Sequence, residues 1–112
     1  MNAQAFMDRT WRAEMIEGTP VTGANITLII GSDRRAGGNA GCNTFGAPVR
    51  LDGMYFSFGP LTATRRACAA DIMNQEQHYL DILARIGGWR MKNGQFFLTG
   101  SDGYDLIQFA AE

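Results

Sequence analysis

The sequence predicts a mainly β (α+β) fold: a small antiparallel sheet of about 7–8 short strands, barrel-like or strongly curved, with one packed helix. Three observations lead to this prediction. Glycines punctuate the whole chain, which suits short strands joined by tight turns. Two dipeptides, Asp-Gly at 52–53 and Asn-Gly at 93–94, each lie between segments in which apolar and polar residues alternate. A single segment, about residues 72–86, carries apolar residues at helical spacing.

The chain begins with two expected strands and a third, weaker one. Trp11, Ala13 and Met15 alternate with polar residues and predict a strand over 11–16, which the glycine and proline at 18–20 end. Residues 25–30 place three aliphatic side chains on one face and predict a second strand. Residues 34–41 are rich in glycine and predict a weak third strand.

The Asp-Gly dipeptide at 52–53 predicts a hairpin with a two-residue turn. This turn pairs Leu51 with Met54 and Val49 with Phe56 on one face of the sheet. Asp and Gly tolerate the positive φ that such turns require, and the alternation is compatible with the pairing.

The Asn-Gly dipeptide at 93–94 predicts a second hairpin in the same way. Its turn pairs Met91 with Phe96 and Trp89 with Leu98. A last strand is expected over residues 105–110, after the turn at 101–103.

One helix is expected over about residues 72–86, with Asp71 as its N-cap, Arg85 in the final turn and Gly87 as the C′ residue. One stripe along it is apolar, and we expect this stripe to cover the open face or mouth of the sheet. The stripe consists of Ile72, Met73, Tyr79, Leu80, Leu83 and Ile86.

Residues 1–112 are expected to form one domain, with residues 1–9 as a flexible N-terminus. The formal net charge of −1 and the absence of a Lys/Arg run argue against a nucleic-acid-binding protein. No stretch approaches the roughly 20 apolar residues of a membrane span. The first ten residues lack the apolar core of a signal peptide, so either the protein is cytoplasmic or a targeting segment has been removed.

Cys42 and Cys68 are the only cysteines, and three interpretations of the pair stay open. They form a disulfide or a buried pair of thiols, which would be structural. They bind a metal, although one histidine and no CxxC motif leave the ligand set short. Or Cys68 is a reactive thiol whose pKa is lowered by Arg65 and Arg66. A disulfide would indicate an oxidising compartment.

The two cysteine-containing blocks and several shorter motifs resemble the META domain, or HslJ-like, family of bacterial envelope and stress-associated proteins. The resemblance covers nearly the whole chain. It rests on Trp11, on residues 18–21, on GNAGCNTFG at 38–46, on LDG at 51–53, on FSFGPL at 56–61, on TATRRAC at 62–68, and on MNQE at 73–76 with Tyr79-Leu80. Arg66 departs from the pattern, because a methionine is usual at this position.

The resemblance implies a small barrel-like β fold with a helix packed on it, similar in architecture to a lipid-binding secretion pilot protein. It also implies links to heat shock, stress response and lipoproteins of the cell envelope. No catalytic residues or cofactors come with the family. Many members are secreted or lipid-anchored, whereas no lipoprotein signal is visible in this chain.

Four residues of the motifs are candidates for ligand contacts: Asn43, Thr64, Arg65 and Glu76. Each has a structural alternative. Asn43 would cap nearby backbone groups, and Arg65 would form an ion pair or bind carbonyl oxygens. Glu76 is expected on the polar side of the helix, paired with Arg65 or another cation. No catalytic triad can be assembled around the single histidine, His78.

The sequence therefore favours a non-enzymatic binding or assembly module of the periplasm or envelope, without a cofactor or metal. Its expected partner is an envelope protein or an apolar ligand, bound in a groove between sheet and helix, and the chain is expected to be a monomer or weak dimer. One alternative is a redox or enzymatic activity at Cys68 with Arg65 and Arg66. Another is an inhibitor-like or purely structural module of a larger protein.

Overall fold

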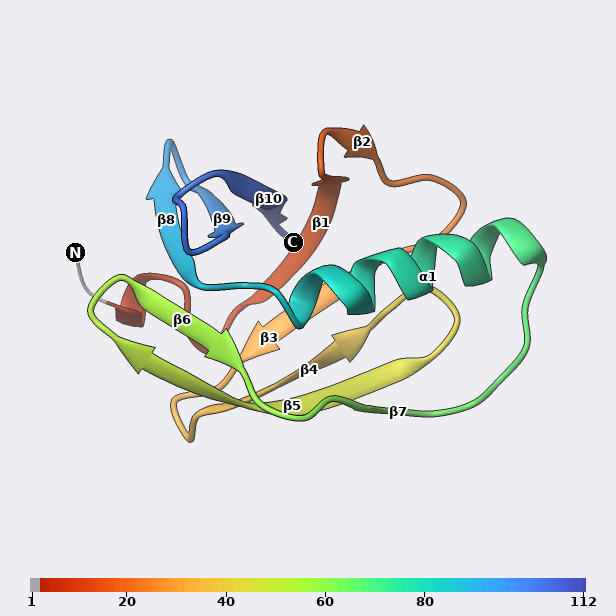
Figure 1. The fold of residues 1–112 in the computed structure, drawn as a ribbon, viewed down its shortest axis with the longest axis horizontal. Helices are drawn as coiled ribbons and strands as arrows, with labels where there is room; N and C mark the ends of the chain where they lie inside the picture. The colour runs from red at the N-terminus through yellow and green to blue at the C-terminus, as the bar shows by residue number, and fades with distance from the viewer. Residues whose placement is uncertain (1–2) are drawn as a thin grey trace.

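The computed structural model describes residues 3–112, which form an eight-stranded antiparallel β-barrel, two additional short strands and one α-helix (Figure 1). In chain order the elements are η1 (Ala3–Ala5), β1 (Thr10–Ile16), β2 (Thr19–Pro20), β3 (Thr27–Ile30), β4 (Arg35–Asn39), β5 (Thr44–Asp52), β6 (Tyr55–Phe58), β7 (Thr62–Ala63), α1 (Ala70–Leu83), β8 (Gly88–Lys92), β9 (Gln95–Thr99) and β10 (Asp105–Ala111). The predicted fold class is confirmed.

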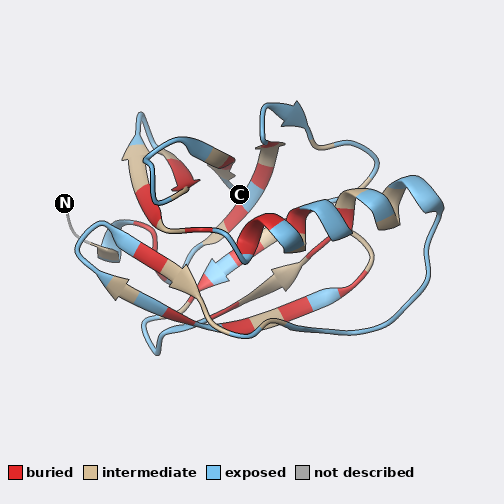
Figure 2. Cartoon of the chain, in the orientation of Figure 1, coloured by how far each residue is buried: buried red, intermediate tan, exposed pale blue. Residues whose placement is uncertain are grey.

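The barrel follows the order β1-β3-β4-β5-β6-β8-β9-β10 and closes where β10 pairs with β1. The shortest strand pairing in the barrel is between β6 and β8, where Tyr55 and Gly88 form the single residue pair. The inward faces of the strands form the core, and its largest fully buried side chains include Trp11, Trp89 and Phe96. Figure 2 shows these buried bands on the strands and on the C-terminal half of α1.

The hairpin at 93–94 has the predicted register, with Met91 opposite Phe96 and Trp89 opposite Leu98. Asn93 and Gly94 have φ values of 53° and 78°, which is the conformation that a type I′ turn needs.

The register predicted for the hairpin at 52–53 is wrong. Asp52 pairs with Tyr55 and Leu51 with Phe56, so the turn residues are Gly53 and Met54 rather than Asp52 and Gly53. Gly53 alone of these two turn residues has a positive φ, 60°. Moving the turn by one residue shifts each pairing by two, so every side chain keeps its face, and the alternation could not distinguish the two registers.

The helix begins and ends earlier than predicted. Ala69, not Asp71, is the N-cap residue and makes no side-chain capping bond, while Asp71 lies in the first turn. Gly87 is not the C′ residue, because the helix ends at Leu83. A Cβ atom at Gly87 would lie 2.8 Å from the backbone nitrogen of Ser101, so this glycine is explained by close backbone packing.

The predicted flexibility of residues 1–9 is wrong for the part that the structure describes. Phe6 is fully buried, and its ring lies 4.6 Å from that of Phe96 and 4.7 Å from that of Trp89, measured between centroids. The indole nitrogen of Trp11 donates a hydrogen bond to the carbonyl oxygen of Phe6. The segment before β1 is therefore part of the core. Residues 1–2 lie outside the described part of the chain.

Candidate functional site

The fold brings five residues of the sequence motifs together at one end of α1. They come from the β4–β5 connection, from the segment after β7 and from the helix, and are separated by up to 34 positions in the sequence. We call this group the clasp: Cys42, Asn43, Thr64, Cys68 and Glu76.

Glu76 is buried, with 5% of its surface exposed, although it was expected on the polar side of the helix. Its Oε1 accepts hydrogen bonds from the backbone nitrogens of Cys42 at 2.9 Å and Asn43 at 2.6 Å. Its Oε2 accepts one from Nδ2 of Asn43 at 2.7 Å. The expectation that it pairs with Arg65 or another cation is wrong, because among residues 3–112 its partners are amide groups. These bonds compensate for the desolvation of the carboxylate.

Asn43 joins three segments of the chain through its side chain. Its Oδ1 accepts hydrogen bonds from the hydroxyl of Thr64 at 3.0 Å and from the backbone nitrogen of Arg66 at 2.6 Å. Its Nδ2 donates to Glu76 and also to the backbone oxygen of Arg66 at 3.1 Å. The expectation that Asn43 caps nearby backbone groups is wrong: the backbone that its side chain binds is that of Arg66, 23 residues away in the sequence.

Cys42 and Cys68 form a disulfide, with a Cα–Cα distance of 6.1 Å. Of the interpretations left open by the sequence, the structure contains the disulfide, and both cysteines of the chain are used in it. The free Cys68 thiol required by the redox alternative is therefore not present in this form of the protein. Within residues 3–112 no group of His, Cys, Asp and Glu side chains is arranged to hold a metal ion.

The clasp and the short pairing of β7 with β5 fix a segment that contributes nothing to the core. Residues 62–71 are all exposed, and Figure 2 shows them as a continuous pale stretch leading into α1. Thr64 holds this segment to β5, since its backbone nitrogen donates to the carbonyl oxygen of Thr44 and its hydroxyl accepts from the nitrogen of Thr44. Hydrogen bonds and the disulfide, rather than burial, determine where the segment lies.

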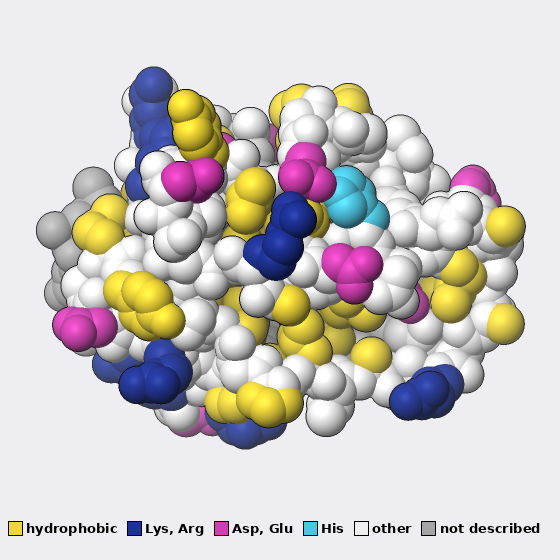
Figure 3. All heavy atoms as spheres, viewed as in Figure 1, with side chains coloured by type: hydrophobic (Ala, Val, Ile, Leu, Met, Phe, Trp, Pro, Cys, Tyr) yellow, Lys and Arg dark blue, Asp and Glu magenta, His cyan; other side chains and the backbone are white. Residues whose placement is uncertain are grey.

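An open groove of about 570 Å³ lies beside the clasp, between α1 and β7. Residues before, in and after β7 form one wall, and residues of α1 form the other. Figure 3 shows hydrophobic side chains gathered in a hollow on this face of the molecule. We call this the α1–β7 groove; its main lining residues are Leu61, Ala63, Arg65, Met73, Gln77 and Leu80.

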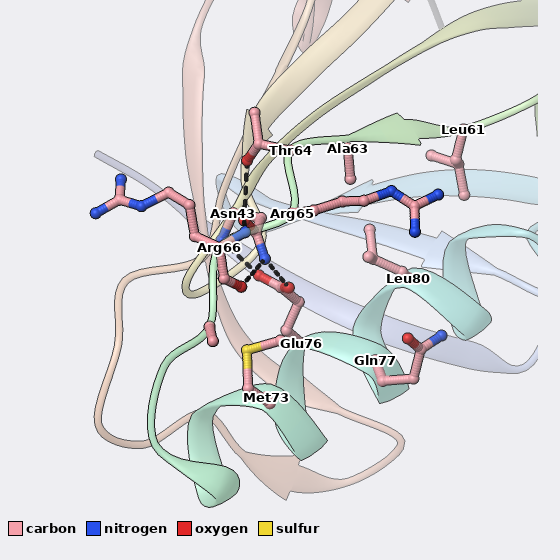
Figure 4. Close-up of a pocket in the computed structure, with 11 residues that line it drawn as sticks. Asn43, Leu61, Ala63, Thr64, Arg65, Arg66, Met73, Glu76, Gln77 and Leu80 are labelled. Atoms are coloured by element: carbon pink, nitrogen blue, oxygen red, sulfur yellow. Dashed lines mark hydrogen bonds between the residues drawn. The ribbon is translucent and has the colours of Figure 1, made fainter.

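Arg65 is the only candidate residue of the motifs that faces the groove without a partner. In Figure 4 its side chain runs along the groove beside Ala63 and Leu80, whereas the side chain of Arg66 points away. Within residues 3–112 its guanidinium takes part in no ion pair or hydrogen bond, so the expected structural contact of Arg65 is not found. The sequence also did not identify Leu61 or Gln77 as groove residues, because the tertiary fold brings the β7 segment and α1 together.

The opposite flank of α1 is tightly connected to the β1–β2 region. Glu17 Oε1 lies 2.7 Å from Nε2 of His78, and its Oε2 lies 3.2 Å from the guanidinium of Arg85. The hydrogen bond from His78, followed by the charge of Arg85, lowers the pKa of Glu17. Gln75 exchanges two hydrogen bonds with the backbone of Thr22. The helix is thus held by these contacts on one flank and by Glu76 of the clasp on the other, where Met73, Gln77 and Leu80 line the open groove.

Comparisons with known proteins agree with this architecture. The model of the META domain family matches residues 4–112. A structure of a Burkholderia xenovorans protein, solved by NMR, is 30% identical, with a TM-score of 0.73, and the match covers 97% of this chain and 85% of that one. A comparison with curated proteins finds no match.

Two more distant structures share the fold alone. One, solved by NMR, is 18% identical with a TM-score of 0.76, and the match covers 98% of this chain and 94% of that one. The other is a crystal structure of a DUF4847 family protein from Bacteroides vulgatus, 13% identical with a TM-score of 0.68, covering 96% of this chain and 94% of that one.

Proposed function

We propose that this chain, which belongs to the META domain family, is a non-enzymatic binding or assembly module of the bacterial cell envelope. The observation that carries the proposal is the α1–β7 groove: an open, partly apolar surface on a closed barrel, beside a helix that the clasp and the contacts with Glu17 and Thr22 hold in place. Concave surfaces with apolar walls and a few polar groups are the usual ligand sites of small domains. The ligand is an envelope protein or an apolar molecule.

The clasp supports a binding role rather than a catalytic one. Its polar groups bind one another: both Glu76 oxygens and both polar atoms of the Asn43 side chain are occupied. A catalytic acid, base or nucleophile needs a free atom that can approach its substrate. The role of the clasp is to hold the wall of the groove in place.

The disulfide supports a location in an oxidising compartment, such as the periplasm, where such bonds persist. A stress-associated role in the envelope, as the family resemblance implies, belongs to the same proposal. Among the described residues, no helix has the length and apolar character needed to cross a membrane.

The proposal is tested by titrating the ¹⁵N-labelled protein with vesicles of envelope phospholipids and, separately, with extended peptides. We expect amide shifts that localise to the α1–β7 groove for at least one of these ligands. Filling the groove with the substitution Gln77→Trp should abolish them, whereas Asn74→Trp, on the same helix but outside the groove lining, should not. Shifts elsewhere on the surface, or none for any ligand, would contradict the proposal.

A further inference from the structure

We infer that the ligand of the α1–β7 groove is an extended peptide segment with an acidic side chain, which adds a strand to the free edge of β7. The inference rests on the proposed function, because it names the partner of the same groove. Three features carry it: a missing strand position, an unpaired backbone edge and an unpaired cation.

A position in the sheet next to β7 is not occupied by a strand. β6 and β7 both pair with the same edge of β5, at residues 49–52 and 45–46 respectively. β6 has β8 as its next neighbour, but β7 has no second partner among the described strands. Residues of α1, rather than of a strand, form the facing wall of the groove beside β7. A helix satisfies its backbone groups internally, so it leaves the outer edge of β7 unpaired.

The register of β7 shows which backbone groups are free. Thr64, at the end of the strand, donates its backbone N–H to Thr44 of β5. Ala63 stands opposite Phe45 in the same ladder. Backbone groups of successive residues point to opposite sides of a strand, so the N–H and C=O of Ala63 face away from β5. They offer a donor and an acceptor to an added strand.

Side chains around this edge suit alternating residues of a peptide. Leu61, Ala63 and Arg65 occupy alternate positions; in Figure 4 Leu61 and Ala63 point toward α1, and Arg65 runs along the groove. Met73 and Leu80 form the opposite wall. A strand placed between the walls would direct every second side chain into the groove. The apolar part of the groove would take aliphatic side chains.

The charge of the groove favours an acidic residue in that peptide. The guanidinium of Arg65 lies along the groove without an ion pair within residues 3–112. Glu76, the carboxylate among the lining residues, directs both oxygens to amides and forms no ion pair with Arg65. A carboxylate of the ligand can form a charge-assisted pair with Arg65.

The pairing of Arg65 with an acidic residue is tested with a short peptide of alternating valine and threonine that carries one central glutamate. Its dissociation constant is measured by titration of the ¹⁵N-labelled protein. Arg65→Glu should weaken binding by about tenfold through charge repulsion, while Arg50→Glu, the same change on an exposed arginine of β5 that does not line the groove, should alter it by less than about twofold. Equal effects of both variants would contradict the role of Arg65.

Strand addition is tested with the same peptide N-methylated at alternate residues, which removes one set of backbone donors. We expect one of the two N-methylated registers to lose binding. The variant Ala63→Pro, which removes only an outward N–H, should lose binding too, whereas Ala63→Val should retain it.

Unchanged binding of both methylated peptides would overturn strand addition and leave groove binding intact. Shifts in the groove with phosphatidylglycerol vesicles but not with any peptide would overturn the peptide as ligand and retain the proposed function. No shift in the groove with either would overturn both.

Discussion

The carboxylate of Glu76 binds Asn43 at two points, with Oε1 2.6 Å from the backbone nitrogen and Oε2 2.7 Å from Nδ2. This double contact joins α1 to the β4–β5 connection, 33 residues apart in the sequence. Both residues are buried, so neither can replace the other's hydrogen bonds with water. The pair is the centre of the clasp that positions the groove wall.

Replacing Glu76 with Gln should lower the free energy of unfolding by about 2–3 kcal/mol, because one oxygen becomes a donor that faces Nδ2 of Asn43. The Asn43 amide cannot turn over to accept from it, since its Oδ1 already binds Thr64 and Arg66. Urea denaturation measures the change. Gln77→Ala, at the next residue, which is exposed, serves as the control and should change the free energy of unfolding by less than about 0.5 kcal/mol. Similar stabilities of the two variants would contradict the assignment.

The double substitution Cys42→Ser and Cys68→Ser should destabilise the protein by about 2–4 kcal/mol, since the disulfide closes a loop with a sequence separation of 26. Wild-type protein treated with a reductant should show the same urea midpoint as the variant. Mass spectrometry after alkylation would verify reduction. If the verified reduced protein keeps the midpoint of the oxidised one, the disulfide does not stabilise the fold.

Phe6→Ala should lower the free energy of unfolding by about 3–5 kcal/mol, because it leaves a cavity between aromatic rings in the core. Ala5→Ser, on the exposed neighbour, serves as the control and should change stability by less than about 0.5 kcal/mol. Thermal unfolding followed by near-UV circular dichroism measures both. A small effect at Phe6 would mean that the N-terminal segment is not part of the cooperative core.

Tyr79→Phe should raise the free energy of unfolding by about 1 kcal/mol. The Tyr79 side chain is fully buried, and its hydroxyl has no hydrogen-bond partner in the described part of the chain. Burial also raises the pKa of this hydroxyl. Tyr79→Leu, which removes the ring that packs against Phe45, should instead destabilise. A loss of stability in the Phe variant would show that the hydroxyl does bind a partner.

The free energy of unfolding should decrease in acid, because the ion pair between Asp105 and Arg90 is lost. Nε of Arg90 lies 2.8 Å from Oδ1 of Asp105, and Nη2 lies 2.6 Å from Oδ2. The hydrogen bond from Arg90 lowers the pKa of Asp105 below its ordinary 3.8. The unfolded chain therefore binds a proton at a higher pH than the folded one. The stabilisation by this ion pair is complete above the pKa of Asp105 in the unfolded chain. It is lost as the pH falls through the lower pKa of Asp105 in the folded protein.

Asp105→Asn should remove this part of the pH dependence, and Asp102→Asn, in the preceding turn, should not. Urea midpoints measured from neutral pH down into the acid range provide the comparison. Parallel curves for wild type and Asp105→Asn would contradict the prediction.

The sequence predicts best where two local signals agree. At 93–94 both turn residues have a positive φ, and this turn selects one of the registers that the flanking alternation allows. At 52–53 only Gly53 has that conformation, and the alternation fits two registers equally well. The residues of the barrel faces could therefore be predicted, but not the exact partners across this hairpin.

The helix pattern could not predict the burial of Glu76. A carboxylate between polar neighbours on a helix is predicted to be exposed to solvent. The groups that bind Glu76 are backbone nitrogens of the β4–β5 connection, which only the tertiary fold brings close to it. Phe6 and Met7 were overlooked for a related reason, since two apolar residues without periodicity give no helical or strand signal. The motifs contain Asn43, Thr64 and Glu76, which the structure joins to the two cysteines in the clasp, whereas Arg65 lies in the groove.

The segment 62–71 is attached to the barrel by one disulfide and a few hydrogen bonds, and contributes no buried side chain. Within it, Thr64 and Cys68 hold the segment in place, whereas the side chains of Ala63 and Arg65 contribute neither to the clasp nor to the core. Substitution of Ala63 or Arg65 should therefore alter the surface of the groove without altering the scaffold. The fold thus separates the residues that fix this segment from those that it presents to the groove.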